Sequence, residues 1–415
     1  MTTRGATDST PPPHIFDMTA DDLRAWCAAA GLPAYRAAQI HQWVYEKGVA
    51  DPAGMTNLSA RDRDLLADPV RGLSFLTGEI AAHQRASDGT QKLLVDWSEN
   101  SRSGFRVQGS LEQTREPEPA TRLPIYSAPR SLQTECVMIP YGEEIFAAMG
   151  REAPDNVKER RTACISSQVG CPVGCKFCAS GIGGLDGNLT AGRIVEQVWM
   201  LQKVLGTPPL GGGFSPPPRS GGLPRITNVV FMGMGEPLAN FANVTRAIRT
   251  LAAPLPHGFG ISARKITLST VGLPKAIERL ADEFDLPITL ALSLHAPNDD
   301  IRRSLIPWAE YTTIPDLLAA CQKWFDKTGR EITLEYILLG GVNDRPADAR
   351  ELAGIAKSLR ANINLIRYNE VVFPGGGMPF SRPEDEHVRA FQRILRDANI
   401  NVHIRASRGR DISAA

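Results

Sequence analysis

Three cysteines stand close together in the middle of the chain, in the segment Cys171-Pro-Val-Gly-Cys175-Lys-Phe-Cys178. Their C-x3-C-x2-C spacing places three thiolates on one tight loop, where they can bind the corners of a soft-metal site. A structural zinc ion needs four ligands, commonly from paired C-x2-C motifs, and the sequence has no second pair. A 4Fe–4S cluster held by three cysteines keeps one iron open for a further ligand. The spacing therefore favours a cluster over zinc or unligated thiols.

The remaining cysteines do not form a second motif. The chain has seven cysteines, and four of them fall between residues 164 and 178. An odd number in a long chain argues against a disulfide framework and for a metal or redox site in a reducing compartment. Cys164 lies seven residues upstream of Cys171 on a predicted strand, and it is the candidate for a fourth ligand if the metal is zinc.

Strand-like and helix-like segments alternate from residue 133 onward. The predicted strands are 135–139, 162–167, 226–232, 265–269, 288–294, 332–338 and 363–367. The predicted helices are 190–205, 241–252, 274–284, 314–327, 346–360 and 384–398. Repeated βα units predict an α/β fold, either a partial or complete (β/α) barrel or, as the alternative, a doubly wound open sheet.

Polar residues gather where the predicted parallel strands end. They are Gly235, Glu236, Ser269, Ser293, His295 and Asn369. Because the carboxyl ends of barrel strands carry the chemistry in βα barrels, this pattern predicts a functional site at that edge of the sheet.

The composition restricts the partners of the chain. With 46 Lys+Arg against 45 Asp+Glu the net charge is +1, so a nucleic acid would have to bind a local basic patch. The sequence has no apolar run of about 18 residues and no apolar signal segment near Met1, which predicts no membrane span and a cytoplasmic location.

The 415 residues suffice for two or three structural units. We expect a disordered tail at 1–16, a small N-terminal accessory domain at 17–110 that begins with helices, a linker at 111–132, and the barrel at 133–415. The segment 206–225 is rich in Pro and Gly, which predicts a flexible surface insertion in the barrel domain.

The cysteine motif is the signature of radical-SAM enzymes, whose open iron chelates S-adenosylmethionine (SAM), and further motifs narrow the resemblance. They are CISSQVGC (164–171), FMGMGEPL (231–238), TLSTVG (267–272), ALSLHAPND (291–299), EYILLGGVND (335–344) and NLIRYN (364–369). In this order they resemble the RlmN/Cfr family of RNA adenine methyltransferases, in its RlmN branch, from about residue 20 to the last residue. The resemblance implies a radical-SAM barrel with an RNA-binding-like accessory domain.

The resemblance assigns a role to each matching residue. Cys171, Cys175 and Cys178 would bind one 4Fe–4S cluster. SAM would contact Gly235, Glu236, Ser269, Ser293, Leu294, His295 and Asn369. Cys164 would be a resolving cysteine, and Glu135 would accept a proton. Without the resemblance, His295 is typical of a hydrogen-bonded core histidine, Cys164 of a buried thiol, and Glu135 of a surface carboxylate.

The reaction that the resemblance implies is methylation of carbon 2 of an adenosine in 23S rRNA and in tRNA, with two SAM per turnover. Carbon 2 of adenine is electrophilic, so an enzyme cysteine first takes a methyl group. A second SAM yields a 5′-deoxyadenosyl radical that removes hydrogen from this methyl group, and the carbon radical adds to the base. A second cysteine resolves the adduct, and the proton at carbon 2 leaves. The expected protein is a monomer that receives electrons from flavodoxin or ferredoxin.

One family feature is missing from the printed sequence, which keeps an alternative open. The family's methyl-carrying cysteine follows a stretch that matches 408–415, and the sequence stops at Ala415. The alternative is a catalytically incomplete homologue that binds SAM, cluster and RNA. Methylation at carbon 8, as in the Cfr branch, and a zinc-stabilised binding protein are further rivals. Short basic runs support RNA binding locally, although such runs are commonly solvated surface; they hold Lys158, Arg160, Arg161, Arg405, Arg408 and Arg410.

Overall fold

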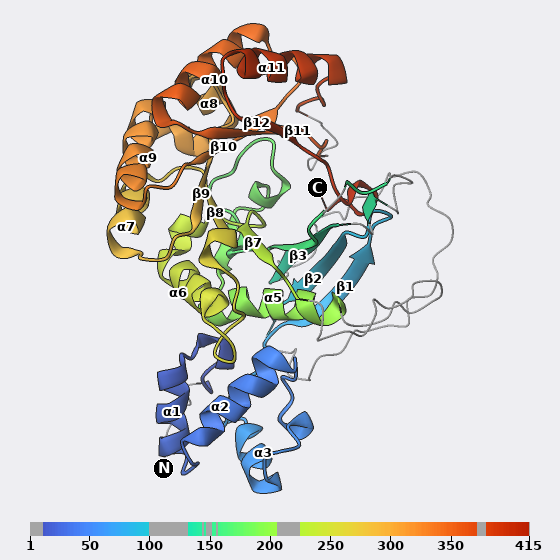
Figure 1. Ribbon diagram of the computed structural model, residues 1–415, viewed down its shortest axis with the longest axis vertical. Coiled ribbons are helices and arrows are strands. Elements are labelled where there is room, and N and C mark those ends of the chain that lie inside the picture. Colours follow the sequence, from blue (N-terminus) through green and yellow to red (C-terminus); the bar gives the residue numbers. More distant parts are fainter. Residues whose placement is uncertain are drawn as a thin grey trace, which may run out of the picture.

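The structure is a computed structural model, and it describes residues 11–98, 132–142, 145–146, 152–154, 157–205, 225–371 and 379–414. A helical N-terminal part lies below a larger α/β body (Figure 1). The expected linker and the Pro/Gly-rich insertion lie outside the described residues, apart from their last residues, Leu132 and Arg225. Within those ranges, no helix has both the length and the apolar character that a bilayer crossing requires.

A ten-stranded sheet forms the framework of the α/β body, in the order β1-β2-β3-β4-β7-β8-β9-β10-β11-β12. The strands are β1 (Glu79–Arg85), β2 (Gln91–Asp96), β3 (Gln133–Tyr141), β4 (Arg160–Cys164), β7 (Asn228–Phe231), β8 (Ile266–Thr270), β9 (Thr289–Ser293), β10 (Thr333–Leu338), β11 (Asn362–Arg367) and β12 (Val402–Arg405). Strands β1 to β4 pair antiparallel, and β4 to β12 pair parallel. A separate two-stranded sheet joins β5 (Gln168–Gly170) to β6 (Leu185–Asn188).

The strand order decides between the two predicted α/β architectures. In a doubly wound sheet the order reverses at a switch point, whereas here it rises continuously from β4 to β12. The barrel interpretation is therefore right and the doubly wound alternative is wrong. Since β1 and β12 form two separate edges of the described sheet, the barrel is partial rather than closed.

Helices connect the parallel strands and cover the outer side of the sheet (Figure 1). They are α5 (Ala191–Leu205), α6 (Phe241–Ala252), α7 (Pro274–Glu283), α8 (Asp299–Leu305), α9 (Ile314–Thr328), α10 (Pro346–Leu359) and α11 (Asp385–Asp397). The buried residues of α6 are Val244, Ala247, Ile248 and Leu251, a spacing of three and four that places them on one helix face. The other predicted helices are confirmed with similar bounds, while the short α8 and β12 were not expected.

The N-terminal part consists of α1 (Ala20–Ala29), α2 (Tyr35–His41) and α3 (Ala60–Leu66), followed in the chain by the β1–β2 hairpin. Thr19 starts α1 with a capping box to Asp22. The hairpin falls within the range expected for the accessory domain, but β2 pairs with β3 and so extends the main sheet. The expected disordered tail is also too long, because Ile15 and Phe16 are fully buried in the core.

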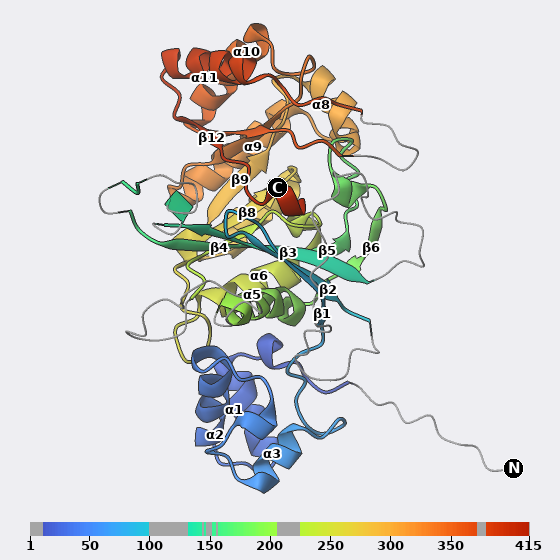
Figure 2. The same cartoon turned by 90° about the vertical axis from the view of Figure 1, so that its right-hand side faces the viewer.

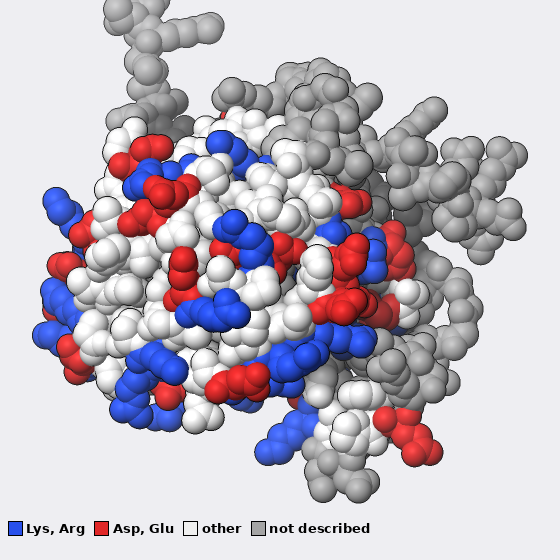
Figure 3. Space-filling model, turned by 90° about the horizontal axis from the view of Figure 1, so that it is seen from above, with Lys and Arg blue, Asp and Glu red and all other residues white. Residues whose placement is uncertain are grey.

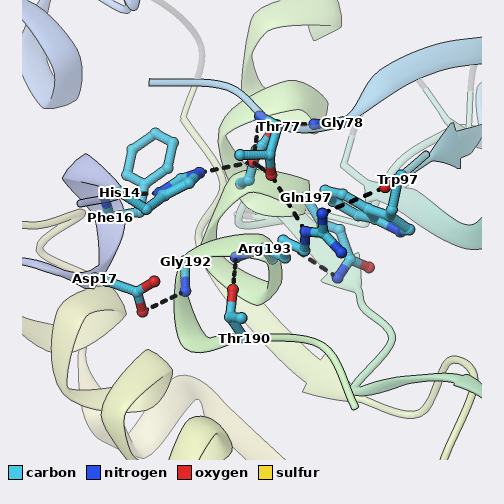
Figure 4. A network of polar contacts seen from close by, with 11 residues as sticks. His14, Phe16, Asp17, Thr77, Gly78, Trp97, Thr190, Gly192, Arg193 and Gln197 are labelled. Atoms are coloured by element: carbon cyan, nitrogen blue, oxygen red, sulfur yellow. Dashed lines mark hydrogen bonds and ion pairs between the residues drawn. The ribbon is translucent and has the colours of Figure 1, made fainter. Parts of the chain in front are cut away.

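A buried carboxylate fastens the N-terminal part to the barrel. Glu196 on α5 is fully buried and lies 3.0 Å from His14 Nε2. It accepts the backbone N–H groups of Thr77 and Gly78 at 2.9 and 2.8 Å and the Thr77 hydroxyl at 3.0 Å. Figure 4 shows this network together with the Asp17 carboxylate, which accepts the Gly192 N–H at the start of the same helix. The contacts join two chain segments more than a hundred residues from α5.

We expect Glu196→Ala to lower the free energy of unfolding by about 3–5 kcal/mol, because it leaves several buried hydrogen-bond donors without an acceptor. Urea unfolding of the full chain measures this loss. Glu283→Ala on α7, which removes an exposed pair with Arg279, is the matched control and should cost less than about 1 kcal/mol. Equal losses in the two variants would contradict the structural role of Glu196.

A second contact between the two parts joins two histidines. His41 on α2 is fully buried, and its Nδ1 lies 3.1 Å from Nδ1 of His257, which follows α6. One of the two nitrogens must donate, so both rings cannot be protonated on both nitrogens at once. Burial, followed by the charges of His257 and Arg24, lowers the pKa of His41 from 6.5 to about 4.

The free energy of unfolding should therefore depend on pH. A histidine with a lowered folded-state pKa stabilises the fold above its unfolded pKa, and this contribution is lost as the pH falls from 6.5 through about 4. The shift of the His41 pKa from 6.5 to about 4 amounts to at most about 3.4 kcal/mol. We expect urea unfolding between pH 7 and 4 to show this slope, and His41→Gln to flatten it. The exposed His403→Gln should leave the slope unchanged, and an unaltered slope in His41→Gln would refute the assignment.

Candidate active site

The loop that carries the three cysteines follows β5 and packs against α8. Gly174 has a φ of 67°, a left-handed conformation that glycine adopts without strain, and it turns the chain between Cys171 and Cys175. The Lys176 N–H donates to the Leu305 carbonyl at the end of α8, at 2.9 Å. The loop is thus held by the barrel, and all three thiols are half-buried.

The thiols of this loop lie within electrostatic reach of one another. Burial raises the pKa of Cys171 to about 11, and the charges of Cys178 and Glu236 add to the rise. Burial also raises the pKa of Cys175, with further contributions from Cys178 and Cys171. Cys171 and Cys175, whose ionisation burial opposes, need nearby positive charge to become thiolates, and a metal centre supplies it.

The donor set suits a cluster. Thiolates are soft ligands, the kind that iron–sulfur clusters use. In a 4Fe–4S cluster each thiolate binds a different iron, so the sulfur atoms do not converge on one ion. Cys171, Cys175 and Cys178 on one anchored loop fit this requirement.

Glu236 lies at the end of β7 and is held in place by neighbouring strand ends. It is 4% exposed, and its carboxylate accepts the Val271 N–H and the Thr270 hydroxyl, both at 2.7 Å, and the Leu238 N–H at 3.0 Å. Its own N–H donates to the Gln168 side chain at 2.8 Å. Burial raises its pKa, and the three hydrogen bonds oppose that rise. Glu236 is therefore a fixed acceptor beside the cysteine loop, not a solvated turn residue.

Gly235 allows the loop after β7 to approach the chain after β4. Its φ is 101°, and a Cβ atom there would lie 2.6 Å from the Gln168 Cβ and 2.8 Å from the Ser167 hydroxyl. A side chain at this position would collide with both residues, so only glycine fits.

The other predicted SAM contacts also lie at the carboxyl ends of the strands. The Ser269 hydroxyl at the end of β8 is 3.2 Å from the Ser293 hydroxyl at the end of β9. Leu294 is fully buried, and Asn369 follows β11, where its side-chain oxygen accepts from Arg382 at 3.0 Å. The structure thus brings these residues to one edge of the sheet, as expected.

His295 is buried and lies beside the cysteine loop. Its φ is 58°, its Nδ1 accepts the Ile337 N–H at 3.1 Å, and its ring lies edge-on to Phe177 of the cysteine loop, with centroids 5.1 Å apart. Burial, followed by the charge of Arg302, lowers its pKa to about 3, so the ring is neutral. Because Nδ1 is an acceptor, the proton resides on Nε2.

Cys164 ends β4 and faces the sheet interior. It is 9% exposed, and burial raises its pKa, while the charge of Arg405 on β12 and the Met232 N–H oppose this rise. The charge of Arg405 also reaches Glu335 on β10, a buried carboxyl whose pKa is raised by burial. A cation from the last strand therefore favours the thiolate of Cys164.

Glu135 lies on β3 with its side chain 45% exposed, and its carboxylate is 3.1 Å from Nζ of Lys92 on β2. The same Lys92 ammonium donates to the Ser413 carbonyl at 3.3 Å. Nearby, Asp411 accepts the Ser87 N–H at 2.8 Å and Asp88 accepts the Gly409 N–H at 3.1 Å. The C-terminal segment thus folds back onto the β1–β2 hairpin beside Glu135; its red end is drawn near the upper end of β1 and β2 in Figure 1 and in front of the sheet in Figure 2.

Ser166 connects β3, at Glu135, to the loop after β7, at Met234. The sequence patterns did not single it out as a site residue. Its hydroxyl donates to the Glu135 carbonyl at 2.7 Å and accepts the Met234 N–H at 2.8 Å. Gln197 on α5 holds the Ser166 backbone N–H and carbonyl, both at 2.9 Å. Ser166 stands inside the CISSQVGC motif, but nothing in the spacing distinguishes it from Ser167.

Charged side chains of both signs are interspersed among the described residues on the face in Figure 3. Among the basic residues considered for RNA, Arg161 pairs with Glu159 at 2.6 Å and Arg408 lies 3.9 Å from Asp88. Arg160 stacks over Tyr141, and Arg405 and Arg410 are exposed. This mixed distribution of charge agrees with the net charge of +1.

Comparisons with known proteins extend the resemblance over the whole chain. Residues 14–70 match the family described as the ribosomal RNA large subunit methyltransferase N-terminal domain. A probable dual-specificity RNA methyltransferase RlmN of Thermosynechococcus vestitus is 37% identical over 97% of this chain and 96% of its own length. The dual-specificity RNA methyltransferase RlmN of Syntrophus aciditrophicus is 38% identical over 97% of this chain and 94% of its own.

A solved structure agrees with both fold and sequence. The crystal structure of a radical SAM methyltransferase from Sphaerobacter thermophilus matches with a TM-score of 0.77 at 36% identity, over 97% of this chain and 98% of that one. Identity at this level over nearly the full length of each relative, together with the matched N-terminal domain, shows that the chain belongs to the RlmN family of radical-SAM methyltransferases.

Proposed function

We propose that this protein methylates carbon 2 of an adenosine in 23S rRNA and in tRNA, with two SAM per turnover. The observation that carries the proposal is the juxtaposition of three cysteines on one loop with Glu236 at the strand ends, in a chain of this family. The cofactors would be one 4Fe–4S cluster on Cys171, Cys175 and Cys178, and SAM. When bound, the cluster supplies the electron that cleaves SAM.

The residues of the chain would divide the remaining tasks. Glu236, fixed by Val271 and Thr270, would accept hydrogen bonds from the SAM amino group, and Gly235 would let the SAM pocket close against Gln168. Ser269 and Ser293 offer hydroxyls, and His295 offers an Nε2–H donor. All these groups stand on strand ends that the sheet holds rigidly, so they can orient SAM without moving.

Two further side chains would act on the RNA base. Glu135 would accept the proton from carbon 2, and the ion pair with the Lys92 ammonium at 3.1 Å holds its carboxylate in place. Cys164 would resolve the protein–RNA adduct as a thiolate, which the nearby cation of Arg405 favours. Ser166 holds the Glu135 backbone, so it would maintain the distance between the proton acceptor and the SAM pocket.

The experiment is anaerobic reconstitution of the full chain with iron and sulfide, followed by reaction with SAM, dithionite and unmodified rRNA or tRNA. Mass spectrometry of the products should detect 5′-deoxyadenosine together with 2-methyladenosine. Formation of 8-methyladenosine would refute the position of methylation. A chain extended beyond Ala415 by a cysteine is tested in parallel. If the 415-residue chain releases 5′-deoxyadenosine but no 2-methyladenosine, while the extended chain forms both, the alternative of a homologue made incomplete by the absent carrier cysteine is correct.

In the chain extended by a cysteine, which would carry the methyl group, a Cys164→Ala variant separates the resolving role from the carrying role. It should keep the cluster and form 5′-deoxyadenosine but yield no free 2-methyladenosine, because the adduct lacks its resolving thiol. Cys27→Ala, which changes a buried thiol on α1, is the control and should methylate normally. Normal methylation by Cys164→Ala would remove Cys164 from the proposed mechanism.

A further inference from the structure

Arg302 is an unusual arginine, because it is buried and forms no ion pair with a carboxylate of the described residues, although the charge of Asp299 acts on it. It lies on α8, which Asn298 caps, and only 1% of its side chain is exposed. The next residue, Arg303, is exposed and pairs with Asp300. Burying an unpaired guanidinium costs several kcal/mol, so such a cation requires a compensating group.

The hydrogen bonds of Arg302 leave most of its donors unused. Nη2 donates to the Val271 carbonyl at 2.6 Å. Nε and Nη1 are buried and have no hydrogen-bond partner within the described part of the chain. A guanidinium has five N–H donors and no acceptor, so the unused donors point to an acceptor that the polypeptide does not provide.

The surroundings of Arg302 identify that acceptor. Cys175 is the first group whose charge offsets the effect of burial on Arg302, and Arg302 in turn stabilises the Cys175 thiolate. Leu305 and Ile306, which end and follow α8, pack with Val173 and Phe177 of the cysteine loop. The guanidinium therefore lies beneath the cysteine loop in an apolar environment, where hydrogen bonds to charged sulfur are strong.

The position of Arg302 is also tied to Glu236 through one residue. The Val271 carbonyl accepts from Arg302, and the Val271 N–H donates to the Glu236 carboxylate at 2.7 Å. A buried cation and a buried carboxylate are thus both hydrogen-bonded to the residue that follows β8.

We infer that Arg302 is a positioning residue of the cluster site, whose unused N–H groups donate to a sulfide of the cluster beside Cys175. This inference rests on the proposed cluster binding. Hydrogen bonds to sulfur and nearby positive charge stabilise the reduced, more negative form of a cluster. Arg302 therefore raises the reduction potential of the cluster. Its positive charge also offsets the negative charges of the three thiolates and of Glu236, which repel one another.

The test compares the reduction potentials of reconstituted full chains without SAM, measured by titration with EPR detection. The neutral variant Arg302→Met should decrease the equilibrium constant for cluster reduction at least tenfold, which is 59 mV for one electron. Arg302→Lys should lose less, because it keeps the charge but not the fork of donors. Arg303→Met, one residue away on the same helix, should match the wild type. An unchanged potential in Arg302→Met would overturn the inference.

A second measurement does not depend on the stability of a neutral variant. In wild-type protein labelled with 15N-arginine, pulsed EPR of the reduced cluster should show a 15N coupling that survives Arg303→Met and vanishes in Arg302→Lys. Absence of that coupling from a reduced wild-type cluster would also overturn the inference.

SAM affinity, measured separately, distinguishes a rival acceptor. If Arg302→Met keeps the potential but binds SAM more weakly, the acceptor is the SAM carboxylate and the inference is wrong. The outcome is independent of methylation, because the potential is defined in a loaded protein that does not modify RNA. A wild-type chain that takes up no cluster would refute both the proposed function and this inference.

Discussion

Replacing Cys175 by alanine should abolish cluster binding and with it all formation of 5′-deoxyadenosine. With two thiolates left on the loop, a cluster would have two irons without protein ligands, and it would not survive reconstitution and desalting. Iron bound per chain should fall from about four to near zero. The same result is expected for Cys171→Ala and Cys178→Ala, since each thiolate would bind a different iron of the cluster.

The matched control is Cys321→Ala. Cys321 is fully buried on α9 among apolar residues and takes no part in the site. This variant should lose about 1 kcal/mol of stability at most while it keeps its iron and its absorbance near 400 nm. Retention of full iron content by Cys175→Ala would contradict the cluster assignment, and zinc in place of iron would favour the zinc rival.

Gly235→Ala should lower kcat/KM for SAM cleavage about 100-fold, equivalent to about 2.7 kcal/mol of transition-state stabilisation. The added methyl group would lie 2.6 Å from the Gln168 Cβ at a φ of 101°. To relieve this contact, the loop after β7 must move away from Gln168. That displacement breaks the hydrogen bond from the Glu236 N–H to Gln168 and moves the carboxylate that is proposed to bind the SAM amino group.

SAM affinity, measured by isothermal titration on the loaded protein, should fall together with the rate, while the iron content stays normal. Gly354→Ala is the control, because a Cβ at Gly354 on α10 meets no atom within 4 Å. That change should stabilise the helix by about 0.5–1 kcal/mol without an effect on SAM. Wild-type SAM affinity in Gly235→Ala would show that the close approach at Gly235 is not needed for binding.

Much of the fold and site follows from local sequence patterns. The alternation of strands and helices from 133 to 398 is confirmed, because periodic apolar residues such as those of α6 encode both the element and its buried face. The edge of the sheet that carries Glu236, Ser269 and Ser293 is also as expected, since parallel strands must present their carboxyl ends together. The C-x3-C-x2-C spacing alone was enough to single out the cysteine loop.

Other features of the site depend on residues far apart in the chain. Glu135 looks like an ordinary half-exposed carboxylate, and its ion pair with Lys92 exists because β2 lies beside β3. The contacts of Glu196 with His14 and Thr77 join segments separated by more than a hundred residues, and no local sequence pattern encodes them. The expected domain boundaries placed the β1–β2 hairpin in the accessory domain, whereas β2 pairs with β3 of the main sheet, which lies beyond a long intervening segment.

The sequence by itself determined the family, the cysteine loop and the strand ends, because motif spacing and periodicity are properties of neighbouring residues. Only the tertiary structure decided which charges meet. Arg302 and Cys175 are brought together by the packing of α8 against the cysteine loop, and Arg405 reaches Cys164 across the sheet from its last strand. Electrostatic energies depend on distance and burial, and both are set by the folded chain.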